Sequence, residues 1–138
     1  MANEAVHFRC HSSDNTLQYS SVSHTGRDKK NLGFGEAVYI GTAESNWSDY
    51  PCLNNGPDKS NRNRILDNKL GPEVTGECVD IKEGTSGGLI RGNTFDGNAL
   101  SNEKGARSWV NCKGEQYVIA QNKGKNSIEF GFRVSFEF

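Results

Sequence analysis

Acidic, basic and amide side chains recur with the same spacing in two short segments of the sequence. Asp80 and Lys82 stand two residues apart, and Asn111 and Lys113 repeat that spacing further along the chain. Residues two apart on a β-strand point to the same side, so each pair presents its polar groups to one face. A lysine that has lost its proton can act as a general base, and a nearby carboxylate can orient it. The pattern suits proton abstraction, and it equally suits the binding of a polar ligand.

These pairs lie inside a repeat that predicts the fold. Stretches with alternating apolar and polar residues recur as EAVHFR (4–9), EAVYIG (36–41), ECVDIK (77–82), SWVNCK (108–113) and FGFRVS (130–135). A second kind of stretch follows each of the first four, at 15–22, 63–70, 89–95 and 118–124. Two strand types that alternate along a chain with Gly- and Asn-rich corners predict a β-solenoid, all-β and with about four to five turns. We expect a single domain over 1–138 with a long inserted loop at 43–62.

Alignment of the repeats sorts the residues into columns that stack from turn to turn. The expected inward columns are Val6/Val38/Val79/Val110/Phe132, Phe8/Ile40/Ile81/Cys112/Val134, Leu17/Ile65/Ile90/Ile119 and Val22/Leu70/Phe95. A corner column of Ser20/Asn68/Asn93/Asn122 predicts a ladder of side-chain hydrogen bonds. The expected outward columns are His7/Tyr39/Asp80/Asn111/Arg133, Arg9/Gly41/Lys82/Lys113/Ser135 and a small or flat one, Ala5/Ala37/Cys78/Trp109/Gly131. We expect the flat column to form a floor on which a flat ring could lie.

The outward face carries more basic than acidic residues, and the inserted loop adds aromatic rings beside it. We predict that the ligand-binding residues are Tyr39, Trp47, Tyr50, Asp80, Lys82, Asn111 and Lys113. Aromatic rings stack on sugar faces and basic groups pair with carboxylates, so the predicted ligand is an acidic polysaccharide. Only Asp80, with Glu83 at the edge, supplies a carboxylate to the face, so we expect neither a metal nor another cofactor.

Charge and hydropathy exclude two other classes of partner. The net charge of −1 lacks the basic excess that a general nucleic-acid binder needs. No run of about 18 apolar residues is present, so no membrane span is expected.

Four longer successions carry a resemblance to a known group of proteins. GFGEAVYIGTAESNW, PDKSNRNRILDNKLGPEVT, ECVDIKEGTSGGLIRGNTFDGNAL and SWVNCKGEQYVIAQN resemble the right-handed parallel β-helix proteins of the pectate-lyase-like superfamily. The resemblance extends over essentially the whole chain and implies a right-handed parallel β-helix. The superfamily includes lyases, hydrolases, epimerases, phage tailspikes and non-enzymatic modules, so function has to be argued from the site.

Three functions remain open at this point. The first is a secreted module that binds an acidic glycan through the outward face of its first-strand sheet. The alternative is a uronate polysaccharide lyase acting by β-elimination, for which the resemblance implies Lys82 or Lys113 as the base, with Asp80. Two lysines about 5 Å apart would lower the pKa of one of them. The third is a structural or assembly fragment of a longer solenoid, self-associating through apolar stack ends with Phe8, Phe136 and Phe138.

The cysteines and one glycosylation pattern bear on the compartment. We favour a disulfide between Cys52 and Cys78, which would pin the inserted loop to the stack, with Cys10 as a competing partner for Cys52. Cys112 falls in an inward column and is predicted to be a buried thiol. The acceptor pattern at 46–48 (Asn-Trp-Ser) favours secretion.

Overall fold

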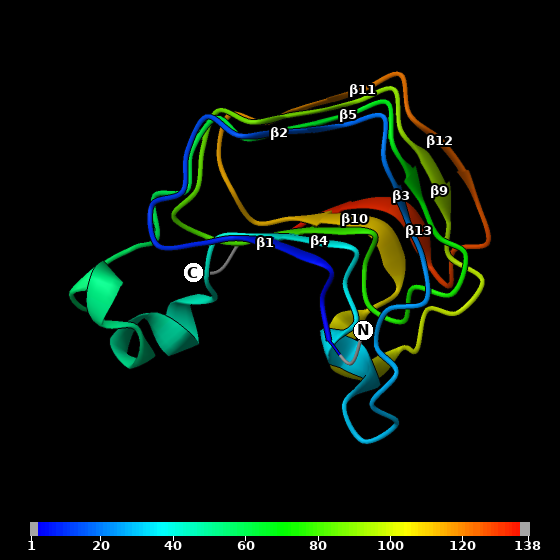
Figure 1. The fold of residues 1–138 in the computed structure, drawn as a ribbon, viewed down its shortest axis with the longest axis horizontal. Coiled ribbons are helices and arrows are strands. Elements are labelled where there is room, and N and C mark those ends of the chain that lie inside the picture. Colours follow the sequence, from blue (N-terminus) through cyan, green and yellow to red (C-terminus); the bar gives the residue numbers. More distant parts are fainter. Residues whose placement is uncertain (1–2, 136–138) are drawn as a thin grey trace.

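The chain folds into a right-handed parallel β-helix made of three parallel sheets (Figure 1). The computed structural model describes residues 3–135. Sheet A contains, in order, β1 (Val6–Phe8), β4 (Val38–Ile40), β7 (Val79–Ile81), β10 (Ser108–Cys112) and β13 (Phe130–Val134). Sheet B contains β2 (Thr16–Gln18), β5 (Arg64–Leu66), β8 (Leu89–Arg91) and β11 (Val118–Ala120). Sheet C contains β3 (Ser21–Val22), β6 (Lys69–Leu70), β9 (Thr94–Asp96) and β12 (Lys123–Lys125).

The register of sheet A matches the predicted columns. Val79 pairs with Val38 on one side and with Val110 on the other. All three side chains are fully buried, so the residue that follows each valine along its strand points out of the core. The predicted inward columns of sheets B and C also pair as expected, and Cys112 is a buried free thiol as predicted.

A ladder of asparagine side chains supports the corner between sheets B and C. Asn68 Nδ2 donates to Asn93 Oδ1 at 3.1 Å, and Asn93 Nδ2 donates to Asn122 Oδ1 at 3.0 Å. The same acceptor oxygens take the backbone N–H groups of Asn68 and Asn93 at 2.9 Å. The ladder therefore satisfies buried backbone groups that water cannot reach, which confirms the prediction. A second pair, Asn15 and Asn63, does the same at another corner and was not predicted.

The flat column does not form a floor on the outer face, contrary to the prediction. Ala37 and Cys78 are fully buried members of the core cluster. Trp109 stacks against Phe95, with ring centroids 6.1 Å apart. Ala37 and Cys78 precede β4 and β7, so strand alternation does not apply to them. Trp109 lies within β10, and its ring packs beside Gly124 of β12.

The disulfide joins Cys10 to Cys52, and the favoured Cys52–Cys78 pairing is wrong. Cys78 is a buried free cysteine, because its side chain points into the core rather than outward. The bond ties the inserted segment back to the turn before it, with a sequence separation of 42.

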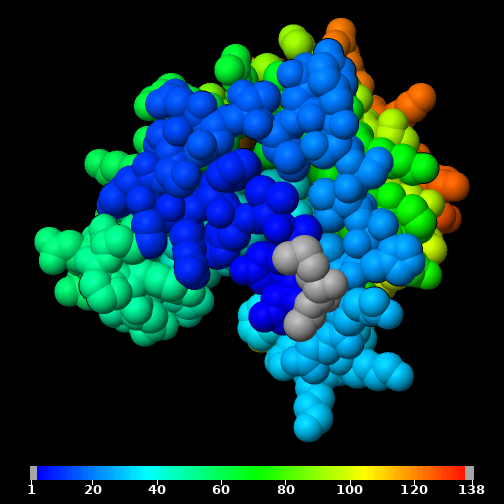
Figure 2. Space-filling view, viewed as in Figure 1, coloured from blue at the N-terminus to red at the C-terminus, as the bar shows by residue number. Residues whose placement is uncertain are grey.

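Two lobes project on either side of the outer face of sheet A (Figure 1). The first, which we call the 43–62 lobe, contains the 3-10 helices η2 (Glu44–Asp49) and η3 (Pro51–Leu53). The second, which we call the η1–η4 lobe, contains η1 (Leu32–Phe34) and η4 (Glu103–Gly105). The space-filling view shows a recess between the two lobes (Figure 2). The repeat supplies the flat sheet, and these non-repeating segments give it walls.

The two ends of sheet A are edge strands. Phe130, Phe132 and Val134 of β13 are exposed, whereas Val6 and Phe8 of β1 are half-buried. Phe136 and Phe138, which we predicted at the stack end, lie outside the described residues. Across residues 3–135 no helix reaches the length and apolar content that a membrane crossing requires.

Candidate functional site

Two adjoining cavities of about 280 and 300 Å³ lie on the outer face of sheet A. Both are lined by Glu77, Asp80, Lys82 and Lys104, so they form one continuous depression, which we call the sheet A groove. One half adds Gly105, Asn111, Lys113, Arg133 and Ser135. The other half adds Gly33, Phe34, Glu36, Tyr39, Ala43, Ser45 and Asn46.

Lys82 and Asp80 form an ion pair in the middle of the groove. Asp80 lies in β7 and Lys82 follows directly after it, with both side chains on the same face. Lys82 Nζ lies 2.8 Å from Asp80 Oδ2. Burial by itself lowers the pKa of Lys82, but the charges of Asp80, Tyr39 and Glu77 more than offset it. The pKa of Lys82 is therefore raised, and the side chain is an ammonium at neutral pH. The expected lowering of a lysine pKa by the Lys82–Lys113 pair is wrong for Lys82, because its near neighbours are acidic.

Tyr39 lies beside Lys82 on the neighbouring strand β4. Lys82 Nζ is 5.1 Å from the centre of the Tyr39 ring. Burial raises the pKa of Tyr39, more than Lys82 lowers it, so the phenol keeps its proton. His7 packs edge-on against the same ring with centroids 4.5 Å apart, and its Nε2 donates to the Gly41 carbonyl at 2.8 Å. These contacts hold Tyr39 as a neutral hydrogen-bond donor next to a cation.

Asn111 links Asp80 to the end of the groove that is richest in basic residues. Asn111 Nδ2 donates to Asp80 Oδ1 at 3.4 Å, and the Ser135 hydroxyl donates to Asn111 Oδ1 at 3.1 Å. Lys113 and Arg133 line this half of the groove. Lys113 Nζ is 4.0 Å from Glu83 Oε1. A carboxylate that entered here would meet two cationic side chains.

The predicted site residues are more buried than the columns implied. Asp80 is 3% exposed and Asn111 is 7% exposed. The side chains of Lys82 and Lys113 are 13% and 21% exposed. We expected a wall on one side only, from the inserted loop, but a lobe rises on each side and makes the face a recess. Desolvation strengthens every charge interaction within such a recess.

Trp47 and Tyr50 are not brought into the groove. Trp47 Nε1 donates to the Thr42 carbonyl at 2.9 Å, inside the 43–62 lobe. Tyr50 packs under Arg9, 4.9 Å from the ring centre to the guanidinium carbon. The segment contributes Ala43, Ser45 and Asn46 to the lining instead. The aromatic wall predicted from composition is therefore a polar wall.

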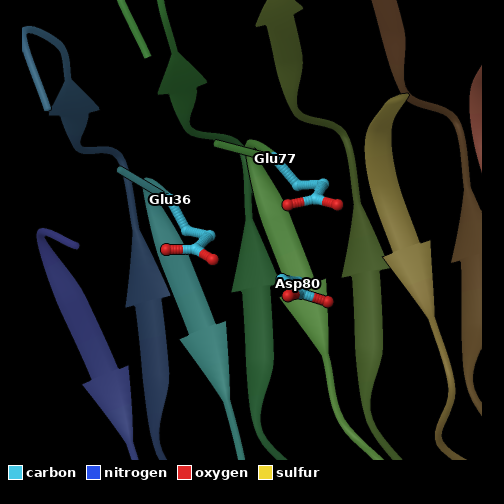
Figure 3. A group of neighbouring side chains, drawn as sticks. All are labelled: Glu36, Glu77 and Asp80. Carbon is cyan, nitrogen blue, oxygen red and sulfur yellow. The ribbon is translucent and has the colours of Figure 1, made fainter. Parts of the chain in front are cut away.

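Glu36 and Glu77 join Asp80 in an acidic cluster that we did not predict (Figure 3). One carboxylate oxygen of each lies within 4.8 Å of the others, and all three residues are buried. Burial, and then the charge of Asp80, raises the pKa of Glu36 to about 8 and that of Glu77 to about 7. The signal was present in the repeats, since both residues stand two places before an inward valine. Strand alternation would place them in the core, but they precede the strands and face the groove.

The acidic cluster has the chemistry of a site for a hard cation. Calcium and magnesium prefer carboxylate oxygens, and three oxygens at this spacing could share one ion. Lys82 already neutralises Asp80, and the raised pKa values of Glu36 and Glu77 remove further negative charge near neutral pH. The expectation of no metal rested on Asp80 being the sole central carboxylate, and that premise is wrong.

The η1–η4 lobe supplies a basic residue, Lys104, that the repeats could not reveal. Glu103 Oε2 accepts a hydrogen bond from the Gly33 backbone at 3.2 Å, which joins the two short helices. Lys104 Nζ lies 3.4 Å from the centre of the Phe34 ring, and the residue lines both halves of the groove. Lys104 lies in a non-repeating segment, so no column contains it.

Comparisons with known proteins agree with the fold. No protein-family model and no curated protein matches the chain. Among solved structures, it is similar to an alginate lyase from Paenibacillus sp. str. FPU-7, with 35% sequence identity and a TM-score of 0.81. The match covers 90% of this chain and 39% of the lyase, so the chain spans well under half of that protein. The similarity is to a polysaccharide-lyase-like parallel β-helix.

Proposed function

We propose that the chain is the groove-bearing part of a β-helix lyase that cleaves an acidic polysaccharide of the alginate type by β-elimination. The observation that carries the proposal is the trio of Lys82, Asp80 and Tyr39 in the sheet A groove. A lysine, which becomes a base once it has lost its proton, lies beside a phenol in a groove lined by further basic residues, and this arrangement matches the needs of the reaction. The similarity to an alginate lyase favours cleavage over the binding module that ranked first from sequence.

The charges of the groove favour a ligand that bears carboxylates. Lys82, Lys104, Lys113 and Arg133 line it, and the raised pKa values of Glu36 and Glu77 reduce the opposing negative charge. Basic side chains pair with uronate carboxylates, and buried partners such as Asn111 can hydrogen-bond sugar hydroxyls. A polyuronate therefore fits better than a neutral glycan.

Elimination needs a base, a proton donor and neutralisation of the uronate carboxylate. In our proposal Arg133 and Lys113 hold the carboxylate, which makes the adjacent C–H bond more acidic. The free-amine form of Lys82 takes that proton, the C–O bond to the next sugar breaks, and a C=C bond forms. The Tyr39 phenol gives its proton to the leaving oxygen. The products are a new chain end with a hydroxyl group and an unsaturated uronate.

Binding without cleavage is the second candidate, and the Asp80–Lys82 ion pair favours it. At 2.8 Å this contact keeps Lys82 as an ammonium, which pairs with a uronate carboxylate and does not abstract a proton. In either case we propose an extracellular location, since the Cys10–Cys52 disulfide is typical of an oxidising compartment.

The test is formation of unsaturated uronate from purified polymers. The chain is incubated with polymannuronate, polyguluronate and polygalacturonate, and ultraviolet absorbance of the new C=C bond is followed. We expect absorbance to rise with at least one alginate component. Lys82→Gln should lower the rate at least 100-fold, and Tyr39→Phe at least tenfold.

The matched control is Lys29→Gln, which removes the same charge from an exposed loop position. It should keep the parent rate. Binding of the polymers without any rise in absorbance would support the second candidate and reject the lyase. A Lys82→Gln variant as active as the parent would remove Lys82 from the mechanism.

A further inference from the structure

A second depression, of about 480 Å³, lies over sheet C and takes no part in the sheet A groove. We call it the sheet C trough. It is lined by Lys69, Pro72, Thr94, Phe95, Asp96, Lys123, Gly124 and Lys125. Sheet C forms a different side of the β-helix from sheet A (Figure 1).

The parallel register places basic residues in line along one wall of the trough. Lys69 of β6 pairs with Thr94 of β9, which pairs with Lys123 of β12. Two strand spacings separate the lysines, which is about 10 Å. Both lysines are exposed, and within residues 3–135 neither forms an ion pair. Two free cations with a hydroxyl between them therefore face the solvent.

The opposite wall carries a lysine and a carboxylate that pair with each other. Lys125 Nζ lies 3.5 Å from Asp96 Oδ2. Asp96 Oδ1 accepts from Asn126 Nδ2 at 2.9 Å and from the Asn98 backbone at 3.2 Å. These bonds fix the carboxylate, and Oδ2, which Lys125 contacts, keeps a second lone pair for a ligand hydroxyl. The net charge of the lining is +2, from three lysines and one aspartate, on a chain whose net charge is −1.

The floor between the two walls is flat and backed by aromatic rings. Its middle column is Phe95 and Gly124, and the Phe95 side chain is fully buried beneath it. A Cβ at Gly124 would lie 2.9 Å from the Trp109 ring, so this ring supports the β12 backbone directly. No side chain rises from Gly124 into the trough, and a flat ring has room between the walls.

We propose that the sheet C trough is a second binding site for an acidic sugar chain. Lys69 and Lys123 pair with carboxylates of successive sugar units, and Asp96 accepts a hydrogen bond from a sugar hydroxyl. This mixture of free cations and a fixed anion fits a ligand with both carboxylates and hydroxyls. A polyphosphate, which offers only acceptors, would be repelled by Asp96. The choice of alginate as probe rests on the proposed function.

The test compares alginate binding by two double variants. Both are made with Lys82→Gln, so that the polymer is not cleaved during titration. Lys69→Gln with Lys123→Gln should weaken alginate binding by roughly fivefold, from the loss of two exposed ion pairs, and reduce its salt dependence. The control, Lys29→Gln with Lys30→Gln, removes the same charge from the loop between β3 and η1 and should stay within about twofold of the parent. With Lys82 present, cleavage of a mannuronate tetrasaccharide should be unchanged by Lys69→Gln with Lys123→Gln.

Three results would overturn the site. They are equal affinity of the two double variants, no alginate binding by the parent, and competition by poly-glutamate as strong as that of alginate at equal carboxylate concentration. The last result would mean that charge alone is recognised. Failure of the proposed function is distinguishable from failure of this site. It would appear as no absorbance change in the chain with Lys82 unchanged, while the ratio of the affinities of the two double variants still reports on the trough.

Discussion

At the scale of single residues, the chemistry of the groove depends on the protonation state of Lys82. Its nearest charged contact is Asp80 at 2.8 Å, and Tyr39 and Glu77 add to the effect of that carboxylate. The side chain is thus a cation at neutral pH. Lys82 can act as a base only as a free amine, so the ion pair sets the pH range in which the proposed reaction proceeds.

The first prediction concerns the pH profile of cleavage. Because the pKa of Lys82 is raised, kcat/KM on alginate should increase as the pH is raised into the alkaline range. Asp80→Asn removes the largest contribution that raises this pKa and leaves burial, which lowers it. The rise should therefore move to lower pH by about one unit or more. A profile that Asp80→Asn does not move would exclude the Lys82 amine as the group that titrates.

The second prediction concerns stability and Glu36. Its pKa is about 8 when folded, well above the usual value of 4.5, so between these pH values the folded chain holds a proton that the unfolded chain has lost. The free energy of unfolding should fall as the pH rises from 5 to 8. Glu36→Gln has no proton to lose at this position. The difference in free energy of unfolding, variant minus parent, should therefore be more favourable to the variant at pH 8 than at pH 5, by on the order of 3 kcal/mol.

Urea unfolding at the two pH values measures this difference. Glu44→Gln, at an exposed position of η2, is the control and should show the same difference from the parent at both. If Glu36→Gln behaves like Glu44→Gln, the Glu36 carboxyl is ionised without cost and the described burial does not hold in solution.

At the scale of elements, strand alternation predicted well within strands and failed at their beginnings. Val79, Asp80 and Ile81 lie in β7, and the columns placed each on its correct side. Glu77 and Cys78 precede β7, where the backbone turns, and alternation placed them on the wrong sides. The error at Glu77 left a carboxylate of the groove unpredicted. The error at Cys78 led to the wrong disulfide pairing. Both follow from applying a strand rule to a corner.

The third prediction concerns the Cys10–Cys52 disulfide. It closes a separation of 42 residues, so its reduction should lower the free energy of unfolding by up to about 4 kcal/mol. Calorimetry with and without a reducing agent measures the change. Cys78→Ala should show the same effect of reduction, because Cys78 is not bonded. Loss of the effect in that variant would restore the Cys52–Cys78 pairing.

At the scale of the whole molecule, the groove arises from a regular stack and two irregular lobes. The repeats made the sheets, the core columns and the Asn ladder predictable, because each depends on contacts between equivalent positions. The wall formed by the inserted segment was predicted, but the wall formed by the η1–η4 lobe was not, since Lys104 and Phe34 belong to segments with no counterpart in other turns. The depth of the groove, and with it the burial of Asp80, comes from those walls.

The fourth prediction concerns the exposed edge at β13. Val134 is 62% exposed and Phe130 is 48% exposed on a strand with one free edge. Such edges pair with other chains, so the apparent mass should rise with concentration. Val134→Lys should reduce the rise, whereas Ser23→Lys, the same charge at an exposed position elsewhere, should not. Light scattering that gives a constant mass for the parent up to about millimolar concentration would contradict self-association at this edge.

The central claim is that an acidic sugar chain lies in the sheet A groove with its scissile bond at Lys82. The most direct measurement is a crystal structure of the Lys82→Gln variant with a mannuronate tetrasaccharide. We predict a uronate carboxylate against Arg133 and Lys113, with the glycosidic oxygen within hydrogen-bond reach of the Tyr39 hydroxyl. A structure with the oligosaccharide bound only outside the groove, or with its carboxylates turned away from Arg133 and Lys113, would contradict the claim.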